Sequence, residues 1–253
     1  MERTFESLIP RMQPSVPGCP HATIAQYIRT SAIKTCERTL AWRHAQTPYA
    51  LNPGVPQYLY RKPAGTDIHA VFYAGINGRP LDRLTLEHAV ERYPEWADLY
   101  GGVPFEELWV GEGAFNTEAF NENAFNAGAQ FTLTEEALEK ASEPRSITQL
   151  TPDQFVLLPA PDDSREYILR LIYALKPARN ATGIPSVIFE ELEDAIMHGA
   201  LQELLVIPGM AWSDRELASY HARQYTYQVS ERRARANLGN VRGTMTAKMQ
   251  PFG

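Results

Sequence analysis

Hydrophobic residues recur at every third or fourth position in three parts of the chain, and this spacing predicts amphipathic helices. The first part spans residues 21–42, the second residues 185–206 and the third residues 213–238. Gly239 follows the third part, at a position where glycine commonly ends a helix. The connection between the second and third helices is short, so we expect them to form an antiparallel hairpin.

The start of the third helix carries a recognisable pattern. Ser213 is followed three residues later by Glu216, which predicts a capping box with Ser213 as the N-cap. Trp212 and Leu217 flank this box in the spacing of a hydrophobic staple. In the second helix, Gly199 followed by an alanine predicts a notch of small residues, where another backbone approaches closely.

Alternation of hydrophobic and polar residues predicts β-strands elsewhere in the chain. The predicted strands are residues 57–61, 67–74, 154–158 and 167–175. Asn77-Gly78 follows the second strand and favours a tight hairpin turn. We expect the last two strands to pair with each other in an antiparallel sheet. A short helix is expected from Thr85 to about Leu99, with Thr85 as a weak cap.

The middle of the chain, residues 100–150, does not follow either pattern. Ala-Phe-Asn occurs there three times at a period of five, which places Phe115, Phe120 and Phe125 at equal spacing. Three copies are too few for a stacked repeat fold. We therefore predict an inserted loop or extension whose phenylalanines contact a partner surface.

The formal net charge of −6 is distributed unevenly. From Leu217 to the end of the chain, six Arg or Lys residues accompany one acid, so this part carries +5 and residues 1–216 carry −11. A basic end on an acidic chain indicates a partner for that end, although a solvated basic helix face would have the same composition. Residues 240–253 lack periodicity and are expected to be ordered only by a partner.

Sequence motifs for catalysis or cofactor binding are missing, so we predict no catalytic, cofactor-binding or metal-ligating residues. The chain has no phosphate-binding lysine loop, no complete dinucleotide loop and no nucleophile elbow. Glu190, Asp194 and His198 could share one helix face, but a charged, solvated face explains them better. Cys19 and Cys36 are too few for a disulfide framework, and Cys36 fits a core position. No apolar run approaches the roughly 20 residues that span a bilayer, so no membrane role is expected.

A series of short motifs resembles the head-to-tail adaptor, or connector, proteins of tailed bacteriophages. The motifs follow one another through most of the chain outside residues 100–150. They are Val16-Pro-Gly-Cys-Pro20, Cys36-Glu-Arg-Thr39-Leu-Ala-Trp42, Gln57-Tyr58-Leu59, Asn77-Gly78, Leu157-Leu-Pro-Ala-Pro-Asp162, Leu175-Lys-Pro177, Ile184-Pro185, Ala195-Ile196 with Gly199-Ala200-Leu201 and Leu204-Leu205, and Trp212-Ser213 with Leu217-Ala218 and Tyr220.

The resemblance implies an α+β fold that is mainly an α-helical bundle, with a small antiparallel β-sheet or barrel-like element and an extended C-terminal arm. It implies a structural virion protein, with twelve copies in a ring that docks on the portal protein and continues the DNA channel to the tail or nozzle protein. Double-stranded DNA would pass without sequence-specific binding. The protein would lie at the head–tail junction of the virion, and in the host cytoplasm during assembly.

The candidate interface residues follow from this resemblance together with the charge pattern. For portal docking we expect Arg232, Arg233, Arg235, Arg242, Lys248 and Phe252. The expected organisation is an N-terminal helix with the first strands (1–99), the insertion (100–150), a strand pair with the helical hairpin (151–239) and a docking arm (240–253). Alternatives are a tail-side neck or tube component, a small cell-wall hydrolase, and a module that binds a host factor through the three phenylalanines.

Overall fold

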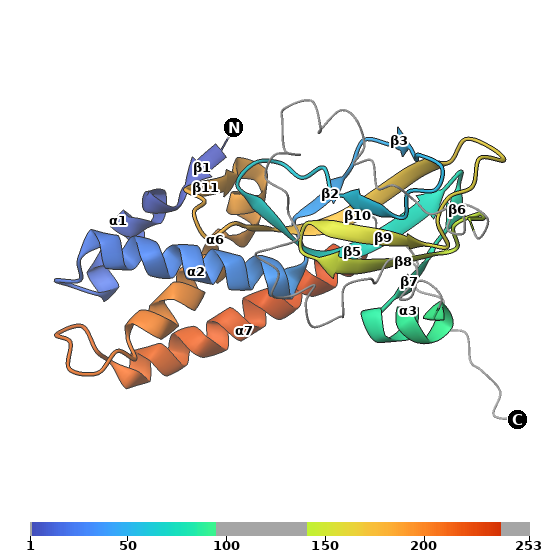
Figure 1. Cartoon of the computed structure of the whole chain (residues 1–253). Helices are drawn as coiled ribbons and strands as arrows, with labels where there is room; N and C mark the ends of the chain where they lie inside the picture. Colours follow the sequence, from blue (N-terminus) through green and yellow to red (C-terminus); the bar gives the residue numbers. More distant parts are fainter. Residues whose placement is uncertain (1, 95–140, 239–253) are drawn as a thin grey trace, which may run out of the picture. The chain divides into compact units, whose positions relative to one another are not determined.

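The computed structural model describes residues 2–94 and 141–238 (Figure 1). The chain divides into two compact units. The unit that we call the helical unit comprises Met1–Arg43, Ala64–Asp67 and Ala174–Gly253, and the β unit comprises His44–Pro63 and Ile68–Tyr173. Two long strands, β5 (Thr66–Ile76) and β10 (Ile168–Pro177), contribute residues to both units.

Three long helices form the core of the helical unit: α2 (His21–Thr39), α6 (Ser186–Leu204) and α7 (Arg215–Leu238). The predicted helical segments are thus confirmed, apart from small differences at their ends. Each helix buries a stripe of residues along one of its faces. In α2 the stripe includes Ile24, Ile28 and Ala32, and in α6 it includes Phe189, Leu192, Ile196, Ala200 and Leu204.

The N-terminal segment packs against the same helices. It forms β1 (Glu2–Thr4), two 3₁₀ turns (Phe5–Leu8 and Gln13–Ser15) and the short helix α1 (Ile9–Met12). β1 pairs antiparallel with β11 (Gly183–Pro185). Arg11 of α1 forms an ion pair with Glu193 of α6 at 2.5 Å, so charge as well as apolar packing holds this segment to the helices.

The β unit contains most of two sheets. One sheet has the order β2 (Arg43–Ala45), β10, β5 and β6 (Arg79–Pro80), with β3 (Tyr49–Ala50) also paired to β10. The other has the order β4 (Gln57–Leu59), β9 (Gln154–Leu158), β8 (Ser146–Thr151) and β7 (Asp82–Leu84). β7 and β8 are parallel, whereas β9 is antiparallel to both of its neighbours. The helix α3 (Leu86–Arg92) covers part of this sheet, with Ala89 against Val156 and Leu158.

The expected fold class is wrong. Within the described residues the chain is a mixed α/β fold with five helices and eleven strands in three sheets, about 42% helical and 26% strand, rather than mainly a helical bundle. Many of these strands have only two or three residues, which is too short for alternation to be visible. β8 also begins inside the predicted insertion of residues 100–150 and ends one residue beyond it.

The expected pairing of the last two strands is also wrong. β9 lies between β4 and β8, whereas β10 belongs to the other sheet. Phe155 to Leu158 are all buried, as in a central strand with both faces covered. Gln57 and Gln154, 97 residues apart in sequence, are joined by a side-chain hydrogen bond of 2.7 Å. Pairing over such a distance cannot be predicted from a local pattern.

The predicted turn at Asn77-Gly78 is confirmed. Asn77 and Gly78 have φ angles of 49° and 83°, the left-handed pair that a type I′ turn requires, and they connect β5 to β6. The Asn77 side chain adds a second function. Its Oδ1 accepts a hydrogen bond from the Ile168 N–H, and its Nδ2 donates to the Glu166 carbonyl, so the turn is attached to the start of β10.

Gly199 is a point of close helix packing, as the small-residue notch predicted. A Cβ atom at this position would overlap the Ser31 Oγ of α2 and lie 2.9 Å from a ring carbon of Tyr225 in α7. The Ser31 hydroxyl donates a 2.7 Å hydrogen bond to the Ile196 carbonyl of α6. Glycine therefore allows three helices to meet at one place.

Substitution of Gly199 by alanine is expected to lower the free energy of unfolding by about 1–3 kcal/mol, because the added methyl group overpacks this contact. Valine should lower it further. Urea unfolding followed by circular dichroism measures both. The sign of the stability change in the alanine variant is decisive, since alanine in an uncrowded helix is more favourable than glycine by about 1 kcal/mol. A stabilised alanine variant would contradict the close packing.

The predicted capping box is displaced by one residue. α7 begins at Arg215, and the Asp214 carboxylate accepts a 2.9 Å hydrogen bond from the Leu217 N–H, so Asp214 is the N-cap. The Ser213 hydroxyl instead donates to the Ile207 carbonyl in the preceding loop. Serine and aspartate are both good N-caps, so their order in the sequence could not decide between them.

Substitution of Asp214 by alanine is expected to cost about 1 kcal/mol of stability, because one N–H at the start of α7 loses its acceptor. The matched control is Glu216→Ala, which removes a carboxylate two residues later and should change stability by less. Equal losses in the two variants, measured by thermal unfolding, would favour the capping box instead.

Candidate docking surface on the helical unit

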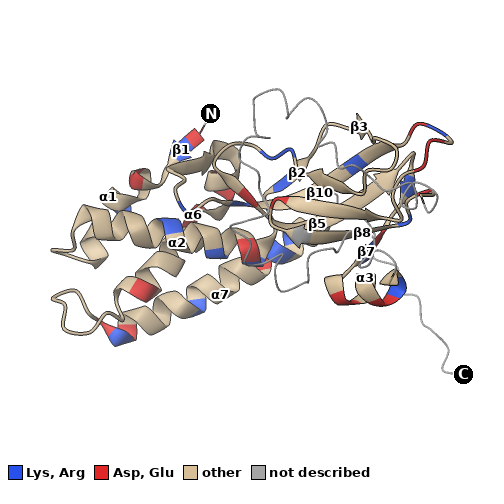
Figure 2. Cartoon of the chain, in the orientation of Figure 1, with Lys and Arg blue, Asp and Glu red and all other residues tan. Residues whose placement is uncertain are grey.

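The helix α7 has one buried face and one open face. Ala218, His221, Tyr225 and Val229 are buried at intervals of three or four residues, where α7 packs against α6 and α2. Arginine positions recur on α7 from its start to its end (Figure 2). The exposed arginines are therefore held on a helix whose orientation is fixed by its opposite face.

Three of the predicted docking residues lie in the last two turns of α7. Arg233 and Arg235 are exposed, and Arg235 pairs with Glu231 one turn earlier at 3.4 Å. Arg232 is half-buried, and its Nε has no hydrogen-bond partner among the described residues. Three guanidinium groups against one carboxylate leave a net positive charge, at the helix end where the dipole favours cations.

Another arginine, which was not predicted, lies beside the middle of α7. Arg38, near the end of α2, lies with its guanidinium carbon 5.4 Å from the centre of the Tyr225 ring of α7. Tyr225 is buried, and its hydroxyl accepts a weak 3.5 Å hydrogen bond from Thr35 of α2. Cation–π contact of this kind connects the two helices and adds positive charge beside α7. This contact could not be predicted from a sequence pattern, because Arg38 and Tyr225 are far apart in the sequence.

The other predicted interface residues lie outside the described residues. They are Arg242, Lys248 and Phe252 in the expected docking arm, and Phe115, Phe120 and Phe125 in the expected insertion.

The location of the negative charge changes the interpretation of the sequence. Residues 95–140 contain ten acids and one lysine, a net charge of −9. Since the whole chain carries −6, the rest of it has a net charge of +3. The acidic character that the sequence analysis assigned to residues 1–216 is therefore concentrated in this one segment.

The structure brings together two histidines from different helices. Nδ1 of His198 in α6 lies 2.7 Å from Nδ1 of His221 in α7, and the ring centres are 5.0 Å apart. One ring must donate its Nδ1–H to the lone pair of the other, which requires at least one neutral imidazole. His198 therefore belongs to a helix–helix contact rather than to the fully solvated face that we expected.

Burial is the main cause that lowers the pKa of both histidines. For His198, Asp194 opposes this effect and Arg11 adds to it, whereas the pKa of His221 is lowered further by His198. Asp194 itself is exposed and pairs with Arg11 at 3.5 Å. The pair therefore favours neutral rings inside the helix contact.

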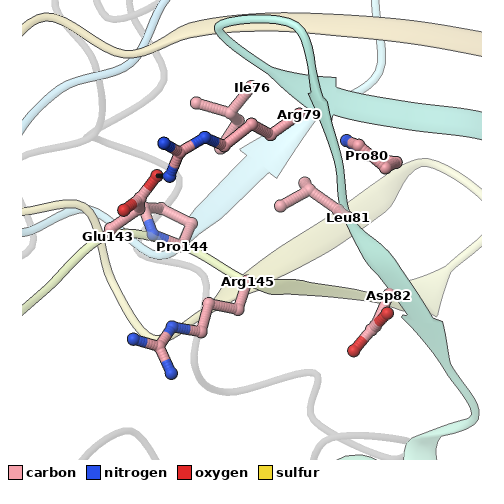
Figure 3. Close-up of a pocket in the computed structure, with 8 residues that line it drawn as sticks. All are labelled: Ile76, Arg79, Pro80, Leu81, Asp82, Glu143, Pro144 and Arg145. Carbon is pink, nitrogen blue, oxygen red and sulfur yellow. Dashed lines mark hydrogen bonds and ion pairs between the residues drawn. The ribbon is translucent and has the colours of Figure 1, made fainter.

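A pocket in the β unit offers a different kind of surface. It has a volume of about 390 Å³ and lies between the β5–β6 turn region and the segment that precedes β8 (Figure 3). Arg79 points toward Glu143, with an ion-pair distance of 3.2 Å, and Arg165 pairs with the same carboxylate. Asp82 pairs with Arg92 at 3.2 Å. Both carboxylates are thus held in ion pairs, which does not suit them to acid–base catalysis.

Neither cysteine is placed for reaction chemistry. Cys19 and Cys36 are free and buried, and burial raises the pKa of Cys36 to about 12, so its thiol stays protonated. In the part of the chain that the structure describes, no group of three or more His, Cys, Asp or Glu residues could hold a metal ion. A search of the helices in that part finds none long and apolar enough to cross a membrane.

No protein-family model matches the chain, and a search of curated proteins found no match either. The candidate surface therefore has to be judged from its own geometry.

The histidine pair makes the helical unit sensitive to acid. Because the pKa values of His198 and His221 are lower in the folded protein than the ordinary 6.5, the unfolded chain binds more protons as the pH falls below about 6.5. The free energy of unfolding is therefore expected to decrease from pH 7 to pH 5. Urea unfolding at a series of pH values measures this slope.

His221→Gln should flatten the slope, because it removes one imidazole and leaves a side chain that can still hydrogen-bond. His69→Gln, at an exposed position in the β unit, is the control and should leave the slope unchanged. A wild-type slope in the His221 variant would show that the pair does not control the acid response.

Proposed function

We propose that the protein is a head-to-tail adaptor of a tailed bacteriophage, a structural protein that forms a ring on the portal and connects the capsid to the tail. The order of short motifs along the chain supports this assignment. The observation that carries it is the group of exposed arginines at the end of α7, directly before residues 239–253.

The chemistry of this arginine group suits a protein partner with an acidic surface. Guanidinium groups bind carboxylates through two parallel hydrogen bonds, and arginine is easier to desolvate than lysine. Each exposed ion pair contributes only about 0.2–1 kcal/mol, so a single copy would bind weakly. Repetition of the contact around a ring would raise the total strength through effective concentration.

The division of the chain into two units also supports an adaptor function. An adaptor must hold one partner on the head side and another on the tail side. Two compact units, each with its own packing, supply two surfaces that can be shaped separately. We assign the portal contact to the helical unit, because the exposed arginines of α7 belong to it.

The test is the double variant Arg233→Glu/Arg235→Glu, mixed with the portal protein encoded in the same genome. Affinity should fall at least tenfold, or about 1.4 kcal/mol, because two attractions become repulsions. Size-exclusion chromatography with light scattering measures the mass of the complex. Under the proposal, about twelve copies of the wild-type protein should bind to the portal ring. The matched control is Arg215→Glu/Arg223→Glu, which reverses two exposed charges nearer the start of the same helix.

Removal of residues 240–253 should likewise leave a folded protein that no longer binds the portal.

If the wild type does not bind the portal but binds a tail component, the protein is a tail-side neck or tube component and the proposal is wrong. If the arginines prove to be needed for binding double-stranded DNA and not for binding a protein, the surface is a nucleic-acid site. Equal binding by both charge-reversal variants would show that the end of α7 is not the interface.

A further inference from the structure

Two imidazole rings face each other between α6 and α7. Nδ1 of His198 lies 2.7 Å from Nδ1 of His221, so the two nitrogens are directed at the same small space. Imidazole nitrogens are good ligands for Zn²⁺, Cu²⁺ and Ni²⁺. Metal ions compete with protons for the same lone pairs. The contact that now holds a proton is therefore also a place for a metal cation.

The backbones that carry the two rings are fixed by the packing around Gly199. His198 is the residue before Gly199, and His221 lies one turn before Tyr225 on the buried face of α7. A Cβ atom at Gly199 would lie 2.9 Å from a ring carbon of Tyr225, so the two helices are in close contact here. Ligands on packed helices keep their spacing before a metal binds, which lowers the cost of assembling a site.

The distance between the two nitrogens is close to the one that a metal ion requires. Zn²⁺ binds histidine nitrogen at about 2.0–2.1 Å, and two such bonds at a tetrahedral angle place the nitrogens about 3.3 Å apart. The present separation of 2.7 Å therefore has to increase by about 0.6 Å, or about 0.3 Å for each ring. Small rotations about the side-chain bonds supply this change without movement of the helices.

Both rings can offer a lone pair at neutral pH. Burial is the main cause that lowers the pKa of each histidine, which favours uncharged imidazoles in the folded protein. When Nδ1 binds a metal, the ring that now donates its Nδ1–H carries that proton on Nε2 instead, because a neutral imidazole holds one proton on either nitrogen. Of the charged groups that act on His198, Asp194 favours a cation and Arg11 opposes it.

We propose that His198 and His221 form a binding site for one divalent transition-metal ion such as Zn²⁺. Among the described residues no group of three or more His, Cys, Asp or Glu could hold a metal ion, so the protein supplies two nitrogens and solvent supplies the other ligands. Closed structural zinc sites have four protein ligands. A site with only two is open, and it binds its metal reversibly.

The pair lies at the boundary between the helix contact and solvent. His221 is only 7% exposed, whereas His198 is half-buried and Tyr220 beside it is 46% exposed. The Tyr220 ring stands edge-on to both imidazoles, with its centre 6.4 Å from that of His198 and 5.2 Å from that of His221. A metal ion therefore enters from the side of His198 and Tyr220. Once bound, it links α6 to α7, whether or not the proposed function is correct.

The experiment is a calorimetric titration of the full-length protein with Zn²⁺ at neutral pH. The wild type should bind one ion per chain, and free zinc at about ten times the dissociation constant should lower the unfolding equilibrium constant about elevenfold. His198→Gln and His221→Gln should each weaken binding at least about tenfold, because each removes one of two ligands. His69→Gln, at an exposed position in the β unit, is the control and should bind as the wild type does. Mg²⁺ should not compete, since it prefers oxygen ligands.

¹⁵N NMR of the histidine side chains gives a second readout that needs no variant. Zinc should shift the Nδ1 signals of His198 and His221 together, while Nε2 of both rings carries the proton. Shifts confined to the exposed histidines would overturn the proposal, as would a failure to saturate with Zn²⁺ at up to about 1 mM. Binding that both glutamine variants retain, or that Mg²⁺ displaces, would place the ion on carboxylates elsewhere and would also refute the site.

Discussion

The arrangement of the helical unit depends on the close contact at Gly199. Because this residue has no side chain, the Ser31 hydroxyl and the Tyr225 ring can both reach the surface of α6. Ser31 then bonds to the Ile196 carbonyl, and Tyr225 bonds to Thr35 and supports Arg38. The rotation of α7 about its own axis follows from these contacts. The direction in which its terminal arginines face the solvent is thus decided more than a full turn away from them.

Long elements with a strong period could be predicted from the sequence, and short elements could not. The stripes of α2 and α6 extend over several turns, and Asn77-Gly78 has few alternatives to a type I′ turn. By contrast, β3 and β6 have two residues each, and β7 joins β8 in parallel across the whole segment from Leu84 to Ser146. Their pairing depends on tertiary contacts. The sheets were therefore underestimated, and the fold was expected to be more helical than it is.

The candidate sites show the same division between local and spatial signals. Arg232, Arg233 and Arg235 stand out in the sequence because they are neighbours in it. The contact of Arg38 with Tyr225 and the pair of His198 and His221 come from segments that only the folded chain brings together. The prediction of the N-cap of α7 was wrong for another reason. Ser213 and Asp214 are adjacent residues with similar capping chemistry, and only the loop geometry distinguishes them.

The order of the units along the chain has a consequence for synthesis on the ribosome. The apolar stripe of α2 is made within the first 40 residues, but its partners α6 and α7 are completed only at Leu238. At translation rates of about 5–20 residues per second, this stripe stays without α6 and α7 for on the order of ten seconds or longer. The β unit, in contrast, has all of its residues by Tyr173. During that interval the apolar stripe of α2 lacks its partner helices, and the helical unit can be completed only after all residues of the β unit have been made.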